Sequence, residues 1–267
     1  TVGGEGAGFV RSGVRFPAPH REMAAAAHED GATVMYDGAH VVGLIAGGQF
    51  QDPLREGADL MTGSSHKTFP GPQGGFLLSS STDDAMHKRL NNAMFPGVCS
   101  SYHLHHVAGK VMALTEFEEF GRDYAIDTVA NAQSFAQALA SEGFDVLAES
   151  RGYTASHQVL TRHGSTDSGA GAKAAQLLEE AGIITNMNML PGDTKAMTPS
   201  GLRLGVQELT RVGFTKSDME VVASFYARVL LKGEDPKAVK RDVHALKSQR
   251  QTIGYCFNDE GRSGYPD

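Results

Sequence analysis

Short apolar runs and helical patterns alternate along the first third of the chain. Residues 20–30 are alanine-rich, contain neither Gly nor Pro, and predict a helix. The apolar run 32–36, which is followed by Asp37, predicts a buried strand, and residues 57–62 and 75–80 predict two more. Strands and helices that alternate at this spacing favour an α/β fold with a mostly parallel sheet flanked by helices.

Beyond residue 82 the pattern becomes mainly helical. A helix is predicted over residues 83–92, and apolar positions at helical spacing predict long helices over 103–119 and 122–142. A second, smaller α/β unit is predicted from about residue 143. Its predicted elements are two strands, at 144–148 and 158–161, and three helices, at 168–181, 215–231 and 235–250.

Composition and charge narrow the function classes. The chain has 267 residues and a formal net charge of −7, which argues against a nucleic-acid partner. No run approaches the roughly 18 apolar residues of a membrane span, so we expect no membrane partner. Two cysteines, Cys99 and Cys256, provide no disulfide framework, and no signal-peptide pattern opens the sequence. We therefore expect a reducing, cytoplasmic compartment.

Charged and hydroxyl side chains gather in two segments that follow predicted strands. Asp37 follows the first of these strands and Lys67 follows the second. Ligands of open α/β sheets bind at the carboxyl ends of the strands, so we expect these two residues to converge on one crevice. The same two segments supply four further candidates, which are His40, Ser64, Ser65 and His66.

Lys67 stands among glycines and hydroxyls, as the lysine of a phosphate-binding loop does. The Walker pattern requires glycine before that lysine, and His66 occupies the position, so this interpretation is rejected. A partly desolvated lysine can instead form a Schiff base with a carbonyl. Pyridoxal phosphate binds in this way and needs a carboxylate at its pyridine nitrogen, a role that Asp37 fits. Taken singly, a surface cation and a turn-capping aspartate are the simpler interpretations of these residues.

Several motifs of this sequence occur in the same order as in a known enzyme family. The chain resembles the serine hydroxymethyltransferases, which belong to the fold-type-I pyridoxal phosphate enzymes, over roughly residues 10–235. The motifs that carry the resemblance are residues 36–48, 62–68, 71–75, 92–97, 185–191, 200–205 and 209–214. The resemblance implies that residues 1–120 form the C-terminal part of the large cofactor-binding domain. It implies that residues 121–267 form a linking helix and the small C-terminal domain.

The resemblance also implies roles for individual residues. Lys67 would bind pyridoxal 5′-phosphate covalently, and Asp37 would pair with the pyridine nitrogen. His40 would lie near the phenolic oxygen of the cofactor, and His66 would flank the lysine. Arg203 would clamp the α-carboxylate of the substrate, for which a bidentate guanidinium is suited.

One motif departs from the common pattern of the family. Ser100 and Ser101 stand where many members have a Gly-Gly pair that approaches the cofactor phosphate of the neighbouring subunit. They could still offer donors to a phosphate, and in this motif the chain resembles a divergent branch that includes archaeal-type enzymes and threonine transaldolases.

Asn188 matches a position that faces the folate in the family. Histidines 103, 105 and 106 lack a fourth ligand of obvious spacing, so no metal is expected.

The activity implied by the resemblance is a reversible aldol-type transfer between a β-hydroxy amino acid and glycine. Serine or threonine would be the substrate. Tetrahydrofolate would be a possible second cofactor, which would place the reaction in one-carbon metabolism. The expected assembly is a homodimer with a shared active site. The alternative is a threonine transaldolase or aldolase that uses no folate.

A second alternative is a non-catalytic or incomplete subunit. Family members have a long region before the segment that this chain resembles, and a separate N-terminal half could complete the site. The chain keeps Asp37, Lys67 and Arg203 together, which argues against a degenerate protein.

Overall fold

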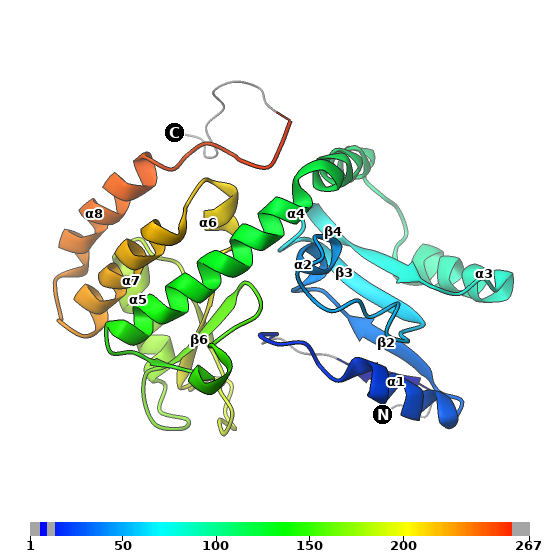
Figure 1. The fold of residues 1–267 in the computed structure, drawn as a ribbon, viewed down its shortest axis with the longest axis horizontal. Coiled ribbons are helices and arrows are strands. Elements are labelled where there is room, and N and C mark those ends of the chain that lie inside the picture. The colour runs from blue at the N-terminus through cyan, green and yellow to red at the C-terminus, as the bar shows by residue number, and fades with distance from the viewer. Residues whose placement is uncertain (1–5, 10–13, 258–267) are drawn as a thin grey trace. The chain divides into compact units, whose positions relative to one another are not determined.

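The computed structural model describes residues 6–9 and 14–257 (Figure 1). The chain forms two compact units, the first of which runs to Arg122 and the second of which begins at Asp123. No helix among the described residues is long and apolar enough to cross a membrane.

The first unit is built on a four-stranded sheet in the order β1-β2-β3-β4. The β1–β2 and β2–β3 pairs are parallel, whereas β4 runs antiparallel to β3. The strands are β1 (Gly6–Phe9), β2 (Thr33–Asp37), β3 (Leu60–His66) and β4 (Pro70–Ser79). The helical elements are α1 (His20–Glu29), α2 (Val42–Ala46), α3 (Asp84–Asn92) and η1 (Ala93–Val98). Val34 and Tyr36 of β2 are buried, as its apolar run predicts.

Two expectations change in detail in the first unit. The strand expected at residues 75–80 begins already at Pro70. The added residues include glycines, which are unfavourable in strands, and pairing with β3 keeps them extended. The two long helices expected on either side of residue 120 are one helix, α4 (Leu104–Ser141). The single glycine there, Gly121, costs about 1 kcal/mol relative to alanine in a helix. It does not end the helix, and it leaves room for the Phe117 ring, which a Cβ at this position would approach to 2.4 Å.

The second unit contains a four-stranded antiparallel sheet in the order β5-β6-β8-β7. Its strands are β5 (Asp145–Val146), β6 (Gln158–Arg162), β7 (Asn186–Asn188) and β8 (Gly201–Gly205). Its helices are η2 (Glu149–Arg151), α5 (Ala170–Glu180), α6 (Gln207–Arg211), α7 (Lys216–Leu230) and α8 (Pro236–Ser248). The core lies between the sheet and these helices and includes Phe135, Leu139, Val159, Leu178, Leu202, Leu204 and Met219.

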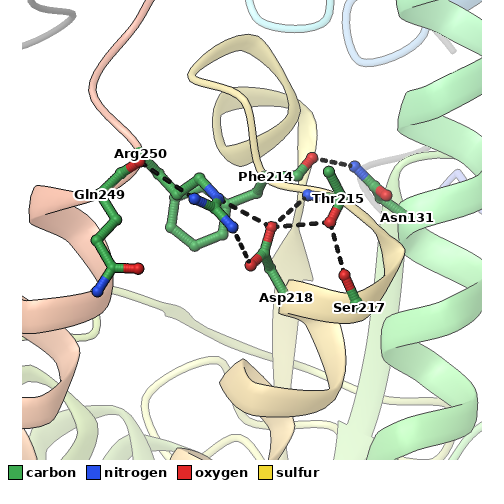
Figure 2. A network of polar contacts seen from close by, with 7 residues as sticks. All are labelled: Asn131, Phe214, Thr215, Ser217, Asp218, Gln249 and Arg250. Carbon is green, nitrogen blue, oxygen red and sulfur yellow. Dashed lines mark hydrogen bonds and ion pairs between the residues drawn. The ribbon is translucent and has the colours of Figure 1, made fainter.

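The start of α7 is held by a buried carboxylate, which Figure 2 shows from close by. The carboxylate of Asp218 accepts hydrogen bonds from the Thr215 amide and hydroxyl, at 2.8 and 2.9 Å, which caps the helix. Arg250, beyond α8, donates to both oxygens of Asp218 at 2.9 and 3.1 Å. Burial opposes the charge on Asp218, but the Arg250 and Thr215 hydrogen bonds outweigh it and lower the pKa. The α8 end is thereby joined to the α7 start.

Candidate active site

Asp37 is the last residue of β2, at the carboxyl end of two parallel strands. Its Oδ1 accepts a hydrogen bond from the Ala39 amide at 2.9 Å and one from the Thr62 hydroxyl at 3.4 Å. Its Oδ2 has no hydrogen-bond partner among the described residues. The side chain is half-buried, so one carboxylate oxygen is fixed by the protein and the other is available to a ligand.

Lys67 lies in the turn between β3 and β4, which residues 67–69 form and which we name the Lys67 turn. The side chain is half-buried, and its Nζ has no hydrogen bond or ion pair within the described part of the chain. Phe69, two residues on, is buried and packs on the rings of Phe76 and Phe117. The turn is therefore anchored by Phe69, and its lysine amine remains available.

Thr68 fixes the Lys67 turn to the segment that follows Asp37. Its buried hydroxyl donates to the His40 carbonyl at 3.1 Å and accepts from the Gly43 amide at 3.1 Å. Gly43, in α2, approaches so closely that a Cβ there would lie 2.2 Å from the Thr68 carbonyl oxygen. These contacts place the Lys67 turn beside the segment that follows Asp37. The convergence of Asp37 and Lys67 on one crevice stays a prediction.

The other residues of the two segments have different surroundings. Ser65 is fully buried, and its hydroxyl donates to the Pro72 carbonyl at 2.7 Å, so it can only accept a further hydrogen bond. Ser64 is half-buried. The exposed ring of His66 lies with Nδ1 3.2 Å from the Gly74 carbonyl and 3.3 Å from the Gly74 amide, so its tautomer decides which bond forms.

One cation near the Lys67 turn was not singled out by the sequence. Lys110 of α4 donates from Nζ to the Gly75 carbonyl at 3.3 Å and lies 5.9 Å from the centre of the Phe76 ring. Nothing in the local pattern distinguishes Lys110 from a solvent-exposed helix lysine. Its position depends on the packing of α4 against β4, which short-range patterns do not encode.

Arg203 and Asn188 lie on neighbouring strands of the second unit. Arg203 is the central residue of β8, opposite Asn186 of β7, and Asn188 is opposite Gly201. Arg203 is half-buried, and this burial lowers the pKa of its guanidinium because desolvation disfavours the charged form. The Asn188 amide group donates to the Met189 carbonyl at 2.6 Å.

Ser100, Ser101 and the three histidines occupy an exposed segment around the start of α4. Ser100 and Ser101 lie between η1 and α4, and both are exposed. The rings of His105 and His106 are 4.4 Å apart, centre to centre. Burial and the charges of the neighbouring histidines and Lys110 lower the pKa of His106. No group of three or more His, Cys, Asp or Glu side chains within the described ranges has a geometry that could hold a metal ion.

The model of the serine hydroxymethyltransferase family matches residues 15–226. The chain belongs to the serine hydroxymethyltransferase family. It is 54% identical to the serine hydroxymethyltransferase of Thermococcus gammatolerans over 254 residues, which are 93% of this chain and 60% of that protein. It is 50% identical to that of Thermoplasma acidophilum over 251 residues, which are 93% of this chain and 58% of that protein. The chain thus spans about 60% of the length of the curated relatives it matches.

A solved structure extends the comparison to the fold. The L-threonine transaldolase of Pseudomonas fluorescens, in its internal aldimine state, matches 97% of this chain and 58% of its own. The TM-score is 0.88 and the sequence identity is 31%. The fold of this serine hydroxymethyltransferase family member is the α/β fold of the fold-type-I pyridoxal-phosphate enzymes, as expected.

The residues at the edge of the first sheet fit the cofactor of this family at two points. Asp37 Oδ2 is a carboxylate oxygen available to a ring N–H, and Lys67 Nζ is an amine available to an aldehyde. The fit is weaker for the cofactor phosphate, because the Ser65 hydroxyl has already donated its proton to Pro72. The Ser64 hydroxyl makes no hydrogen bond within the described part of the chain, so its proton remains available to a ligand.

Proposed function

We propose that this chain carries the cofactor-binding lysine and substrate-binding arginine of a pyridoxal 5′-phosphate-dependent enzyme. The reaction is reversible aldol-type transfer between serine or threonine and glycine, with tetrahydrofolate accepting the one-carbon unit. The observation that carries the proposal is the edge of the first sheet. There, Asp37 and Lys67 each present an atom without a partner among the described residues. Family membership supports the choice of cofactor and reaction.

Each residue of the first unit has a defined task in this proposal. When bound, pyridoxal phosphate supplies an electron sink that stabilises negative charge on the substrate Cα. Lys67 holds the cofactor through its Nζ, in a turn that Thr68 keeps against the His40 carbonyl. Asp37 keeps a proton on the ring nitrogen through Oδ2, while Ala39 and Thr62 fix its other oxygen. His40 faces the phenolic oxygen, and His66 flanks the lysine.

The substrate carboxylate is assigned to the second unit. Arg203 binds the α-carboxylate through two parallel hydrogen bonds, which a half-buried guanidinium makes more strongly than one in bulk water. Ser64, Ser100 and Ser101 are proposed to donate to the cofactor phosphate, whereas the Ser65 hydroxyl, which donates to the Pro72 carbonyl, has no proton to give to it. The first unit corresponds to the C-terminal part of the large domain and the second to the small domain.

A homodimer with a shared active site is part of the proposal. Ser100 and Ser101 would reach the cofactor of the neighbouring copy. Apolar side chains around these serines are strongly exposed, which supports a partner surface there. They are Phe95, Val98, Tyr102 and Leu104, of which Val98 is 78% exposed. Sedimentation of a monomer at micromolar concentration would contradict the dimer.

The unpaired thiols of Cys99 and Cys256 fit a reducing, cytoplasmic compartment, which we also propose.

A folate-independent transaldolase or aldolase is the second candidate. The solved structure that matches 97% of this chain is a threonine transaldolase. The amide group of Asn188, which the family resemblance turns toward folate, already donates to the Met189 carbonyl. The first observation favours a reaction that transfers the amino-acid fragment to a second aldehyde, whereas the Asn188 contact leaves one N–H and the Oδ1 of that amide for a ligand.

The experiment compares two assays on the same cofactor-loaded protein. One supplies serine and tetrahydrofolate, and the other supplies threonine and an added aldehyde. Turnover that depends on tetrahydrofolate supports the hydroxymethyltransferase, and turnover in the second assay alone supports the transaldolase. Absence of bound cofactor after incubation with pyridoxal phosphate would overturn both.

A further inference from the structure

The carboxylate of Asp193 is surrounded by hydrogen-bond donors in the second unit. Its Oδ2 accepts from the Leu190 amide at 2.9 Å, the Ser200 amide at 2.9 Å and the Ser200 hydroxyl at 2.8 Å. Its Oδ1 accepts from the Asp167 amide at 2.8 Å. One side chain thus collects four hydrogen bonds from three residues that are distant from one another in the sequence.

These contacts close the connection between the strands β7 and β8. We name residues 189–200, which form this connection, the Asp193 loop. Leu190 lies just after β7, and Ser200 immediately precedes β8. Because the same oxygen of Asp193 binds both, the two ends of the loop are held together beside the Asn188–Gly201 pair of the sheet. Asp193 therefore fixes the loop end of the β7–β8 hairpin.

Asp167 provides a second, reciprocal clamp on the same loop. Its carboxylate accepts from the Thr194 amide at 2.8 Å, the Thr194 hydroxyl at 2.7 Å and the Lys195 amide at 2.9 Å. Its own amide donates to Asp193, so each aspartate is fixed by the segment that carries the other. The loop is thereby joined to the segment that leads into α5.

The register of β8 decides where Arg203 points. Leu202 and Leu204 are buried in the core of the second unit, and Arg203 between them lies on the opposite face of the strand. A slip of one residue would exchange the two faces and direct Arg203 into the core. The strand β6 pairs with all five residues of β8 and fixes this register, whereas β7, on the other side of β8, is three residues long. The weaker pairing is therefore the one between β7 and β8, where Asn186 lies opposite Arg203.

Among the residues that the structure describes, the donors to Asp193 are neutral amides and a hydroxyl, with no cation among them. The hydrogen bonds from Leu190, Ser200 and Asp167 hold the pKa of Asp193 far below its usual range. An amide in place of the carboxylate would present one acceptor oxygen and one NH2 group to this cluster of donors, so at least one donor would lose its acceptor.

We propose that Asp193 is a positioning residue for Arg203, because its carboxylate holds the short strand β7 beside β8, where Asn186 lies opposite Arg203 and borders the side from which Arg203 meets the substrate carboxylate. This inference rests on the proposed function for the role of Arg203. It assigns Asp193 no contact with substrate or cofactor.

The test compares Asp193→Asn with Asp218→Asn in the cofactor-loaded protein. Asp218 is a matched control, since it is a hydrogen-bonded carboxylate of the same unit that contacts the start of α7 instead of the hairpin. We expect Asp193→Asn to raise the KM for the amino acid by about 10-fold to 100-fold with kcat changed much less. Binding of the corresponding amine, which lacks the α-carboxylate, should not change. Combining Asp193→Asn with Arg203→Lys should add little to the effect of Arg203→Lys alone.

The possible outcomes separate this inference from the proposed function. Amide hydrogen exchange should accelerate in residues 186–188 and 201–205 of Asp193→Asn and not in those of Asp218→Asn. An unchanged KM, an equal loss of amine binding, or unaltered exchange in the hairpin would overturn the positioning role, while the proposed function would stand. A wild-type protein that loads cofactor and binds no amino acid would overturn the proposed function, and with it the role of Arg203 on which this inference depends.

Discussion

The Lys67 turn and the Asp193 loop each hold a segment that carries a proposed active-site residue, and they do so by different physical means. The Lys67 turn is anchored by the buried Phe69 ring, by close packing against Gly43 and by the neutral hydroxyl of Thr68. The Asp193 loop is held by two carboxylates, Asp193 and Asp167, which together accept seven hydrogen bonds. Neutral contacts of the first kind are insensitive to pH, whereas contacts of the second kind require charged carboxylates.

Because they are held differently, the two regions should also tolerate different substitutions. A close-packed turn responds to added volume, because interiors have few voids and backbone atoms must move to admit a methyl group. A loop held by charged acceptors responds to loss of charge, because a neutral group accepts fewer and weaker hydrogen bonds and leaves at least one donor without an acceptor. Substitutions that add volume should therefore affect the Lys67 turn most, and substitutions that neutralise a carboxylate should affect the Asp193 loop most.

The largest effect is expected for Lys67→Ala. The variant removes the only amine of the Lys67 turn, so borohydride should no longer attach the cofactor to the protein. Mass spectrometry of borohydride-treated protein measures the attachment. Lys110→Ala is the matched control, since Lys110 lies near the same turn through Gly75 and should keep the attachment intact. Cofactor attached to another lysine in the wild type would remove Lys67 from the site.

The next largest effect is expected for Arg203→Lys. A lysine keeps the charge and loses the planar pair of donors, so binding of the amino acid should weaken by about 2–4 kcal/mol. Cofactor content should remain at the wild-type level, because the cofactor contacts proposed here belong to the first unit and to the exposed segment before α4. Calorimetric titration of the cofactor-loaded protein with glycine measures the change. Equal affinity in variant and wild type would exclude Arg203 as the carboxylate ligand.

A smaller loss, in stability, is expected for Gly43→Ala. The new Cβ would lie 2.2 Å from the Thr68 carbonyl oxygen, so α2 and the Lys67 turn must separate. Overpacking of this kind costs about 1–3 kcal/mol in the free energy of unfolding. Urea denaturation measures it, with Ala46→Ser at an exposed position of α2 as the control. Unchanged stability in Gly43→Ala would show that packing against α2 does not hold the turn.

The sequence predicts the Lys67 turn better than the Asp193 loop, for a local reason. Asp37 and Lys67 each follow an apolar run, so the strand pattern alone predicts that they share one edge of a sheet. The strands β7 and β8 were not predicted, because β7 is polar at two of its three positions and β8 is a short run between glycines. The clamp between Asp167 and Asp193 joins residues far apart in sequence, and only the tertiary fold brings them together.

Hydroxyl and histidine positions show the same limit within the first unit. Ser64 and Ser65 are adjacent candidates in the sequence, and only the bond to the Pro72 carbonyl distinguishes the buried Ser65. The contact of His66 with Gly74 depends on the turn that folds β4 back on β3. Residue type and spacing identify such candidates, but the partners of their polar atoms depend on hairpin geometry that no local pattern specifies.

The last prediction has no effect at neutral pH and concerns how the two regions respond to acid. A titration with acid tests directly whether the carboxylates hold the Asp193 loop while neutral contacts hold the Lys67 turn. The pKa of Asp193 is lower in the folded than in the unfolded chain, where an aspartate titrates near pH 3.9, so its contribution to stability is complete above about pH 4. That contribution is lost as the pH falls toward the folded pKa. NMR should therefore show the amide signals of Leu190 and Ser200 constant from neutral pH to about pH 4 and moving only in stronger acid. The amide of Gly43, bonded to the Thr68 hydroxyl, should not follow that titration. Movement of the Leu190 and Ser200 signals already near pH 5 would contradict the tight hold on Asp193.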